Sequence, residues 1–361
     1  MSAAEHLKGR IEETGPVTVA DYMTIALTHP DGGYYMSGDP FGRGGDFITA
    51  PEISQMFGEL LGLWTAVVWQ AMGAPSSVHL VELGPGRGTL MSDMLRAALQ
   101  LPPFLDALDV HLVEISPALG AAQEKTLADA RARGMSVSWA PSFDRVPDGP
   151  VIVIANEFFD ALPVRQFHKT PDGWRERLVG VKDDGGFRFL LADDEADHTL
   201  LPEGADELDA GALVEVSPIA MQAMGAVARR MVDYGGAGLV IDYGYGAGGF
   251  GETLQAVKAH AYADVLKNVG EADLTAHVNF TALADAARAA GAAVHGPVPQ
   301  GAFLERLGLS ERLGALMAGA TAEQAAELEA AYRRLTDADE MGVLFKVLAV
   351  TQPGLSVPPW A

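Results

Sequence analysis

Apolar runs alternate with helix-like segments between residues 78 and 157, and this alternation limits the fold more than any other feature of the sequence. The apolar runs are VHLVEL, DVHLVEIS, VSWAPS and VIVIANE, and the segments between them include TLMSDMLRAAL and PALGAAQEKTLADARA. Strands rich in Val and Ile that are separated by helices form βαβ units, whose parallel sheet is covered on both faces. We therefore expect an α/β fold around a doubly wound, mostly parallel sheet.

The rest of the chain extends this core and interrupts it once. Residues 164–215 contain short strand-like runs joined by Asp-Gly turns, which predict an antiparallel insertion. The βα alternation then resumes and ends with the strand-like run VLFKVLAVTQ. The expected domains are an N-terminal helical and lid-like extension (1–60), a core (61–163 and 216–361, with a helical insertion at about 302–336) and the antiparallel insertion (164–215).

Glycine density directly behind the first strong strand predicts a ligand-binding turn. In VELGPGRGTL (81–90), Gly84, Gly86 and Gly88 follow a strand and precede a helix, which is the context in which glycine turns hold ligands. A P-loop would need a Lys before Thr89, and the spacing G-x-G-x-G differs from the dinucleotide fingerprint G-x-G-x-x-G. A phosphate loop is therefore weakly supported, a dinucleotide site is mismatched but stays open, and a tight turn without a ligand is the remaining alternative.

Two acidic residues favour a cationic adenosyl ligand. The Glu82 carboxylate would face a pyrophosphate unfavourably but suits an ammonium or sulfonium charge. Glu114 follows the next strand, where a carboxylate can accept hydrogen bonds from both ribose hydroxyls, unless it is merely a solvated strand end. S-adenosyl-L-methionine has both cationic groups and no phosphate, so we expect it as the cofactor.

Composition narrows the partners and the compartment. The 48 acidic and 25 basic side chains give a net charge of -23, which disfavours nucleic acid, and no apolar segment approaches the length of a membrane span. The absence of Cys excludes disulfides and thiolate zinc sites, and no metal site is expected. The acidic opening MSAAEHLKGRIEETG lacks a signal core, so we expect a cytoplasmic protein, whose oligomeric state the sequence leaves open.

The chain resembles the MidA-like family of class I S-adenosylmethionine-dependent methyltransferases in five stretches. They are GDFITAPEISQMFGELL (45–61), VELGPGRGTLMSDML (81–95), VEISPAL (113–119), ANEFFDALPVRQF (155–167) and DLTAHVNF (273–280). The resemblance implies a Rossmann-like class I methyltransferase fold with a seven-stranded sheet. The mitochondrial members of this family are assembly factors of respiratory complex I. The resemblance therefore also implies methylation of a protein arginine, with the quinone-site subunit of complex I as the target and symmetric dimethylarginine as the product.

The stretch ANEFFDALP supplies the leading catalytic candidates. It follows the strand VIVI, so Asn156, Glu157 and Asp160 are expected at the carboxyl end of a strand, where open α/β sheets bind ligands. An acceptor guanidinium must be held, oriented and relieved of a proton, and carboxylates match its fork. Glu157 and Asp160 are assigned to this task, although Asp160 could instead cap a helix. Asn156 is expected to contact the methionine end of the cofactor or to order the loop.

The stretch DLTAHVNF supplies the second group of candidates. If it is one strand, Asp273, Thr275, His277 and Asn279 lie on one face and apolar residues on the other. The same alternation is typical of any half-exposed strand. An acid, a hydroxyl, an imidazole and an amide suit substrate contacts better than a plain solvent face does. His277 is the candidate base, because the pKa of an unperturbed imidazole lies near neutrality.

Two loops complete the expected site. Residues after the third strand are expected against the adenine, although burial alone explains an aromatic side chain there. Residues 28–52 are rich in Gly, Pro and Asp and form either a lid over the cofactor or an ordinary structured loop. The residues assigned are Ser142, Phe143 and Thr49 to the cofactor, and Asp46 and Glu52 to the substrate.

Overall fold

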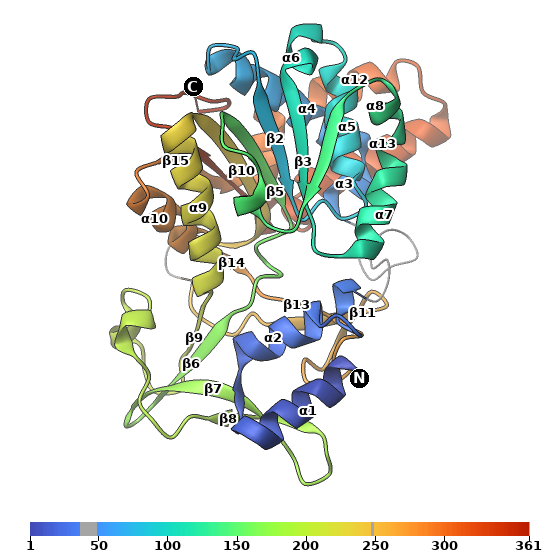
Figure 1. Cartoon of the computed structure of the whole chain (residues 1–361). Coiled ribbons are helices and arrows are strands. Elements are labelled where there is room, and N and C mark those ends of the chain that lie inside the picture. The colour runs from blue at the N-terminus through green and yellow to red at the C-terminus, as the bar shows by residue number, and fades with distance from the viewer. Residues whose placement is uncertain (37–48, 247–248, 361) are drawn as a thin grey trace. The chain divides into compact units, whose positions relative to one another are not determined.

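The computed structural model describes residues 1–36, 49–246 and 249–360 and divides the chain into two compact units (Figure 1). The first unit comprises residues 1–47, 160–222 and 247–279, and the second comprises residues 48–159, 223–246 and 280–361. Among the described residues, no helix combines the length and the apolar character that crossing a bilayer requires.

The second unit is built on a mixed sheet. In sheet order its strands are β15 (Ala293–Pro299), β16 (Phe345–Thr351), β10 (Gly236–Tyr245), β5 (Val151–Asn156), β2 (Val78–Leu83), β3 (Leu108–Val113) and β4 (Ser136–Ala140). The last five strands of this order run parallel, whereas β16 is antiparallel to both β10 and β15. The predicted α/β fold with a mostly parallel sheet is thus confirmed.

Helices cover both faces of this sheet because its strands are apolar on both sides. Every residue of β2 and β5 is buried. On one face, α4 and α5 contribute Leu61 and Met91 to a core with Leu80 and Ile152. On the other face α9 approaches so closely that a Cβ on Gly238 would lie 2.7 Å from Met231 Cε. The helices of the unit are α3 (Ala50–Ile53), α4 (Gln55–Ala71), α5 (Thr89–Ala98), α6 (Pro102–Ala107), α7 (Pro117–Thr126), α8 (Ala128–Ala132), α10 (Phe280–Ala289), α11 (Gln300–Arg306), α12 (Leu309–Met317), α13 (Ala322–Thr336), α14 (Met341–Leu344) and the larger part of α9 (Pro218–Tyr234).

In its described residues, the first unit combines two complete α-helices and the start of α9 with antiparallel sheets (Figure 1). A core of side chains from α2, including Tyr22, Met23 and Leu27, packs with Leu254 and Leu274. One sheet joins β1, β6, β7, β8 and β9, and a second joins β11, β12 and β13, with every pair antiparallel. The elements are α1 (Ala3–Thr14), β1 (Val17–Thr18), α2 (Val19–Thr28), β6 (Arg165–Thr170), β7 (Gly173–Val181), β8 (Phe187–Leu191), β9 (Leu213–Val216), β11 (Gln255–Lys258), β12 (Ala261–Ala263), β13 (Asp273–Thr275) and β14 (Val278–Asn279).

The observed division differs most from the expected domains in two segments, apart from small shifts of the boundaries at residues 160–163 and 216–222. Residues 247–279, expected in the core, cluster with the first unit, because β11 and β13 pair with each other and their apolar residues join the core around α2. Residues 48–60, expected in the N-terminal extension, belong to the second unit, because Phe57 and Leu60 of α4 are buried in the core of its sheet. Hydrophobic spacing predicts which residues are buried, but it does not say against which partner.

Candidate active site

The glycine turn after β2 adopts a conformation that side chains resist. Gly84, Gly86 and Gly88 have φ angles of 63°, 54° and 81°, in the left-handed region. At Gly84 there is also no room, because an added Cβ would lie 2.9 Å from Phe158 Cδ2. Gly88 is the N-cap of α5, so the turn ends at a helix N-terminus, where backbone N–H groups are available to a ligand.

Gln123 of α7 joins this turn to Glu114. Its Nε2 donates to the Gly86 carbonyl (2.8 Å) and to Glu114 Oε2 (3.0 Å), and its Oε1 accepts from Trp139 Nε1 (2.8 Å). Glu114 Oε1 in turn accepts from the Ser116 N–H at 2.7 Å. Burial raises the pKa of Glu114, although these hydrogen bonds oppose the rise. The carboxylate is therefore held in one orientation beside the turn, as a ribose-binding acid requires.

Glu82 lies one residue before the end of β2 and is 3% exposed. Burial raises its pKa to about 8, with a smaller contribution from the Glu114 charge, while a hydrogen bond to the Met91 backbone acts in the opposite direction. Among the described residues, nothing forms a hydrogen bond with Oε2. A buried carboxyl oxygen without a partner is costly, and a cationic ligand group nearby would lower that cost.

Asn156 and Glu157 stand at the carboxyl end of β5. Glu157 has φ +50°, which is rare for a residue with a side chain and costs about 1–3 kcal/mol. Its N–H donates to the Ile241 carbonyl (2.9 Å), and its Oε1 accepts from the Ala50 N–H (3.2 Å) and from Asn156 Nδ2 (3.3 Å). Asn156 Oδ1 is buried and has no hydrogen-bond partner among the described residues. Strain together with an unsatisfied amide oxygen is typical of a ligand site rather than of a packing position.

The described end of the expected lid, residues 49–52, meets the glycine turn. Thr49 is the N-cap of α3 and forms no side-chain cap hydrogen bond. Glu52 Oε1 accepts a 2.6 Å hydrogen bond from the hydroxyl of Thr89, the first residue of α5. Asp46, expected at the substrate, lies outside the described residues. Of the lid residues assigned from the sequence, Thr49 and Glu52 are therefore placed in the second unit, close to Glu157 and to the start of α5.

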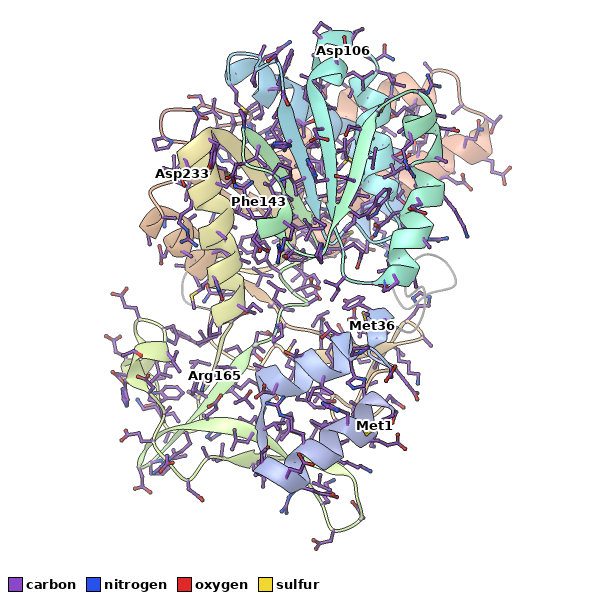
Figure 2. All side chains as sticks on the ribbon, viewed as in Figure 1. Met1, Met36, Asp106, Phe143, Arg165 and Asp233 are labelled. Carbon is purple, nitrogen blue, oxygen red and sulfur yellow. The ribbon has the colours of Figure 1, made fainter. Side chains whose placement is uncertain are left out.

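Ser142 and Phe143 follow β4 but do not belong to it. The strand ends at Ala140, and Ser142 is the N-cap of η2 (Phe143–Arg145). The Arg230 guanidinium of α9 lies over the Phe143 ring, with 5.2 Å from Cζ to the ring centre, and Phe143 is labelled beside α9 in Figure 2. One face of the ring is thus occupied, and at most the other face is available to an adenine.

Two of the assigned acids come together with a tyrosine in the first unit. Tyr35 donates from its hydroxyl to Asp273 Oδ1 at 2.9 Å. Burial raises the pKa of Tyr35 far above its usual value, and the charges of Asp273 and Asp160 raise it further. Asp160 and Asp273 are each 6% exposed. This pair of carboxylates, 113 positions apart in sequence, forms a concentrated negative charge next to a phenol that stays protonated.

The stretch DLTAHVNF is not the single half-exposed strand that its alternation suggests. It divides into β13 and β14, and all three residues of β13 are buried, including Thr275 at 2% exposure. Thr275 Oγ1 accepts from Gln255 Nε2 at 3.3 Å, and the His277 N–H donates to Thr253 Oγ1 at 2.8 Å, so the chain turns away from ladder pairing at His277. Asn279, in β14, is half-buried. Polar side chains buried on a strand need partners, so a plain solvent face does not explain them.

Sequence reasoning missed Gln123 and Tyr35. Gln123 lies within a helical pattern, and Tyr35 lies in a loop region rich in glycine, so neither is part of a motif that predicts its partner. Gln123 lies 9 positions from its partner Glu114, and Tyr35 lies 238 positions from its partner Asp273. The sequence itself has only a weak signal in both cases: an amide within a helical pattern and a tyrosine pair in a turn-rich segment would each need hydrogen-bond partners if they were buried.

The comparisons with known proteins agree with this geometry. Residues 60–298 match a family described as "Putative S-adenosyl-L-methionine-dependent methyltransferase". A solved structure from Burkholderia thailandensis, bound to S-adenosyl-homocysteine, superposes with a TM-score of 0.85 at 31% identity, over 98% of this chain and 92% of that one. The chain is 38% identical to the mitochondrial protein arginine methyltransferase NDUFAF7 of Danio rerio, over 97% of this chain and 86% of that protein. It is 40% identical to the Mus musculus protein of the same name, over 96% and 83%, respectively.

One expectation is overturned by these relatives. The sequence predicted a cytoplasmic location, because its acidic first residues do not have the features of a signal core or a transit peptide. The curated relatives from fish and mouse are both named as mitochondrial proteins, so the prediction of a cytoplasmic location is wrong.

The family match and the solved relative bound to S-adenosyl-homocysteine also settle the cofactor class. This chain superposes with a TM-score of 0.85 on the solved relative that is bound to S-adenosyl-homocysteine, over 92% of that relative's length. The dinucleotide and phosphate-loop alternatives are thereby removed. The chain belongs to the family of S-adenosyl-L-methionine-dependent methyltransferases.

Proposed function

We propose that this methyltransferase transfers methyl groups from S-adenosyl-L-methionine to an arginine guanidinium of a protein substrate. The observation that carries the proposal is 38–40% identity over 96–97% of the chain to proteins named protein arginine methyltransferase. The net charge of -23 is consistent with a cationic acceptor and unfavourable for nucleic acid.

In this proposal the second unit holds the cofactor. The residues present fit it, because Glu82 and Asn156 each have a buried oxygen that no other described residue satisfies, while Gln123 holds Glu114 in place. When bound, S-adenosyl-L-methionine supplies a methyl carbon activated by a sulfonium charge. Glu114 would accept hydrogen bonds from the ribose hydroxyls. The turn from Gly84 to Gly88 would leave room for the ligand, and Glu82, with Asn156, would face its cationic end.

Acceptor recognition is assigned to carboxylates. A guanidinium must be oriented with one nitrogen toward the methyl carbon, and it has to lose a proton as the new bond forms. Glu157 is proposed to hold the acceptor, because its strained backbone and its contacts with Ala50 and Asn156 fix the carboxylate. Asp160 and Asp273, with Tyr35, are proposed to bind the substrate arginine or basic residues near it. Further substrate contacts are proposed for Thr275, Asn279 and Glu52. His277 is proposed as the base that accepts the proton.

The quinone-site subunit of respiratory complex I is proposed as the protein substrate, and symmetric dimethylarginine as the product. Both follow from the family resemblance of the five sequence stretches. Mass spectrometry of that subunit, isolated from cells with and without the gene, tests this target: loss of the arginine modification without the gene supports it, and an unchanged modification excludes it.

A direct assay tests the reaction itself. The full chain is incubated with S-adenosyl-L-methionine and arginine-containing peptides, and methylarginine is quantified. Glu157→Gln should retain S-adenosyl-homocysteine affinity while transfer falls by roughly 100-fold or more, because an oriented charge is lost at the acceptor. Glu124→Gln, in an exposed acid of α7, is the matched control and should behave as the wild type. Cofactor binding without transfer to any arginine would point instead to a non-catalytic assembly protein.

A further inference from the structure

A polar cluster lies within the parallel sheet at the end opposite the glycine turn. His79 is the second residue of β2, and Asp109 and His111 are the second and fourth residues of β3, with His79 directly opposite Asp109 in the strand register. The side chains of alternate residues share one face of a sheet, so all three lie on the same face. His79 and His111 are 9% and 5% exposed. This end of the sheet lies beside α6, where Asp106 is labelled in Figure 2.

Three potential ligand atoms converge in this cluster. His79 Nδ1 lies 3.0 Å from His111 Nε2 and 3.3 Å from Asp109 Oδ2, and His111 Nε2 lies 3.0 Å from Asp109 Oδ2. Ligands about 2.0–2.1 Å from a tetrahedral metal are separated by roughly 3.3 Å. The triangle therefore has nearly the size that a metal ion needs, and its edges would lengthen by a few tenths of an ångström at most.

Hydrogen bonds alone do not satisfy the triangle. If both His79 Nδ1 and His111 Nε2 carry protons for an ionised Asp109, two donors face each other at 3.0 Å. If only one of them is protonated, the other presents a lone pair to the carboxylate. In neither case is there a proton between the two atoms of all three contacts. A cation, by contrast, would attract the lone pairs of the two imidazole nitrogens and the carboxylate oxygen at once.

The atoms behind the triangle are positioned as they are in protein metal sites. Ser138 Oγ lies 2.8 Å from His111 Nδ1, and Ser136 Oγ donates to Asp109 Oδ1 at 2.7 Å. Ligating imidazoles and carboxylates are commonly fixed by such partners on their far side. The backbone at Gly149 passes close to the third ligand, since an added Cβ there would lie 2.9 Å from His79 Nε2.

We propose that His79 Nδ1, His111 Nε2 and Asp109 Oδ2 bind a divalent transition-metal ion, with Zn²⁺ as the best match. Two imidazoles and one carboxylate suit Zn²⁺ better than Mg²⁺ or Ca²⁺, which prefer all-oxygen ligands. The side chain of Asp109 is 31% exposed, so a water molecule can complete a four-coordinate site. This differs from the expectation, drawn from the lack of cysteines, that the chain has no metal site.

The proposed role is structural. His79 and Gly84 are five residues apart along β2, which corresponds to about 16 Å in a strand. The metal is therefore too far from the cofactor turn to take part in methyl transfer. It would link β2 to β3 at the ends of these strands that lie opposite the glycine turn. Because it would bind the folded state in preference to the unfolded chain, it would stabilise the folded state.

Zinc binding to the full-length protein provides the test. After chelator treatment and dialysis, ZnCl₂ is titrated by calorimetry while thermal unfolding is followed in parallel. The wild type should bind about one ion per chain in a site that raises the unfolding midpoint. Asp109→Asn keeps the size of the side chain and should abolish this binding, and Ser138→Ala should weaken it by roughly 10- to 100-fold.

His198→Asn is the matched control. His198 also lies near two carboxylates, but Glu195 and Asp206 approach different ring nitrogens, so no three atoms converge, and the variant should bind Zn²⁺ as the wild type does. Co²⁺ in the wild-type protein provides a second measurement that does not depend on a variant folding, since a four-coordinate site gives intense visible absorption. Absence of stoichiometric binding, binding unaffected by Asp109→Asn, or a loss of binding in His198→Asn would each overturn the proposal.

Discussion

Gln123 donates a 3.0 Å hydrogen bond to the carboxylate of Glu114, and the same nitrogen donates to the carbonyl of Gly86 at 2.8 Å. One side chain on α7 thus fixes two parts of the proposed cofactor site that belong to different strand-helix connections. The bond to a charged group is of the kind whose loss costs about 1.5–3 kcal/mol.

The first prediction follows from this bridge. Gln123→Ala leaves Glu114, the Gly86 carbonyl and Trp139 Nε1 without a shared partner, so S-adenosyl-homocysteine affinity should fall by about 10- to 100-fold. Isothermal titration calorimetry measures this change. Gln70→Ala, at an exposed position of α4, should leave the affinity unchanged. Equal affinities of the two variants would show that Gln123 does not support the site.

The second prediction separates backbone strain from steric exclusion. Gly84→Ala should lose cofactor binding, because φ is +63° and the new Cβ would lie 2.9 Å from Phe158. Gly73→Ala has a similar backbone strain, at φ +88°, but no atom of the described part of the chain would lie within 4 Å of the new Cβ. Both variants should lose about 1 kcal/mol of stability from strain, and only Gly84→Ala should fail to bind S-adenosyl-homocysteine. Retention of binding in Gly84→Ala would refute the tight-turn assignment.

The third prediction concerns pH. Burial raises the pKa of Glu82 to about 8 in the folded protein, against 4.5 for an ordinary glutamate. A carboxyl group with a raised pKa holds its proton more tightly in the folded state. Its contribution to stability is therefore complete below about pH 4.5 and is lost as the pH rises toward 8. Glu82→Gln lacks this titration, so its free energy of unfolding should increase relative to that of the wild type between about pH 4.5 and pH 8.

Urea denaturation at several pH values measures this difference. The same titration affects binding, since a sulfonium ligand favours the ionised carboxyl group: the affinity of the wild type for S-adenosyl-L-methionine should rise with pH over this range. Neutral-sulfur S-adenosyl-homocysteine should show a smaller rise. A constant stability difference between wild type and Glu82→Gln across the range would contradict the assignment.

The fourth prediction addresses the acids of the first unit. Tyr35→Phe removes the hydrogen bond to Asp273 and the phenol whose pKa the charges of Asp160 and Asp273 both raise. Transfer to arginine peptides should fall by roughly 10-fold or more, with unchanged affinity for S-adenosyl-homocysteine. Tyr262→Phe also removes a phenol hydroxyl, but from a residue that is 82% exposed, and it is the control. A parallel loss of transfer and cofactor affinity would assign Tyr35 to general stability.

The cofactor side of the site was more predictable from the sequence than the acceptor side. Gly84, Gly86 and Gly88 are recognisable because a turn between a strand and a helix is a local structure whose residues are consecutive. The fold class was predictable for the same reason, since strand and helix spacing is local. The contact between Tyr35 and Asp273 depends on packing across 238 positions, which spacing does not encode. The alternation in DLTAHVNF was misleading, because burial of both faces of β13 removes the exposed side on which the pattern depends.

The interleaving of the two units has a consequence for how the polypeptide is made. The chain changes unit after residues 47, 159, 222, 246 and 279, so no single cut yields either unit as a continuous fragment. The last strand in the sequence, β16, is inserted between β10 and β15 instead of being added at an edge. During synthesis, β10 therefore emerges with one edge unpaired and waits about a hundred residues for its neighbour. Until then that edge is exposed to wrong pairing, so shielding of the nascent chain is expected to matter more for yield than the stability of the finished protein.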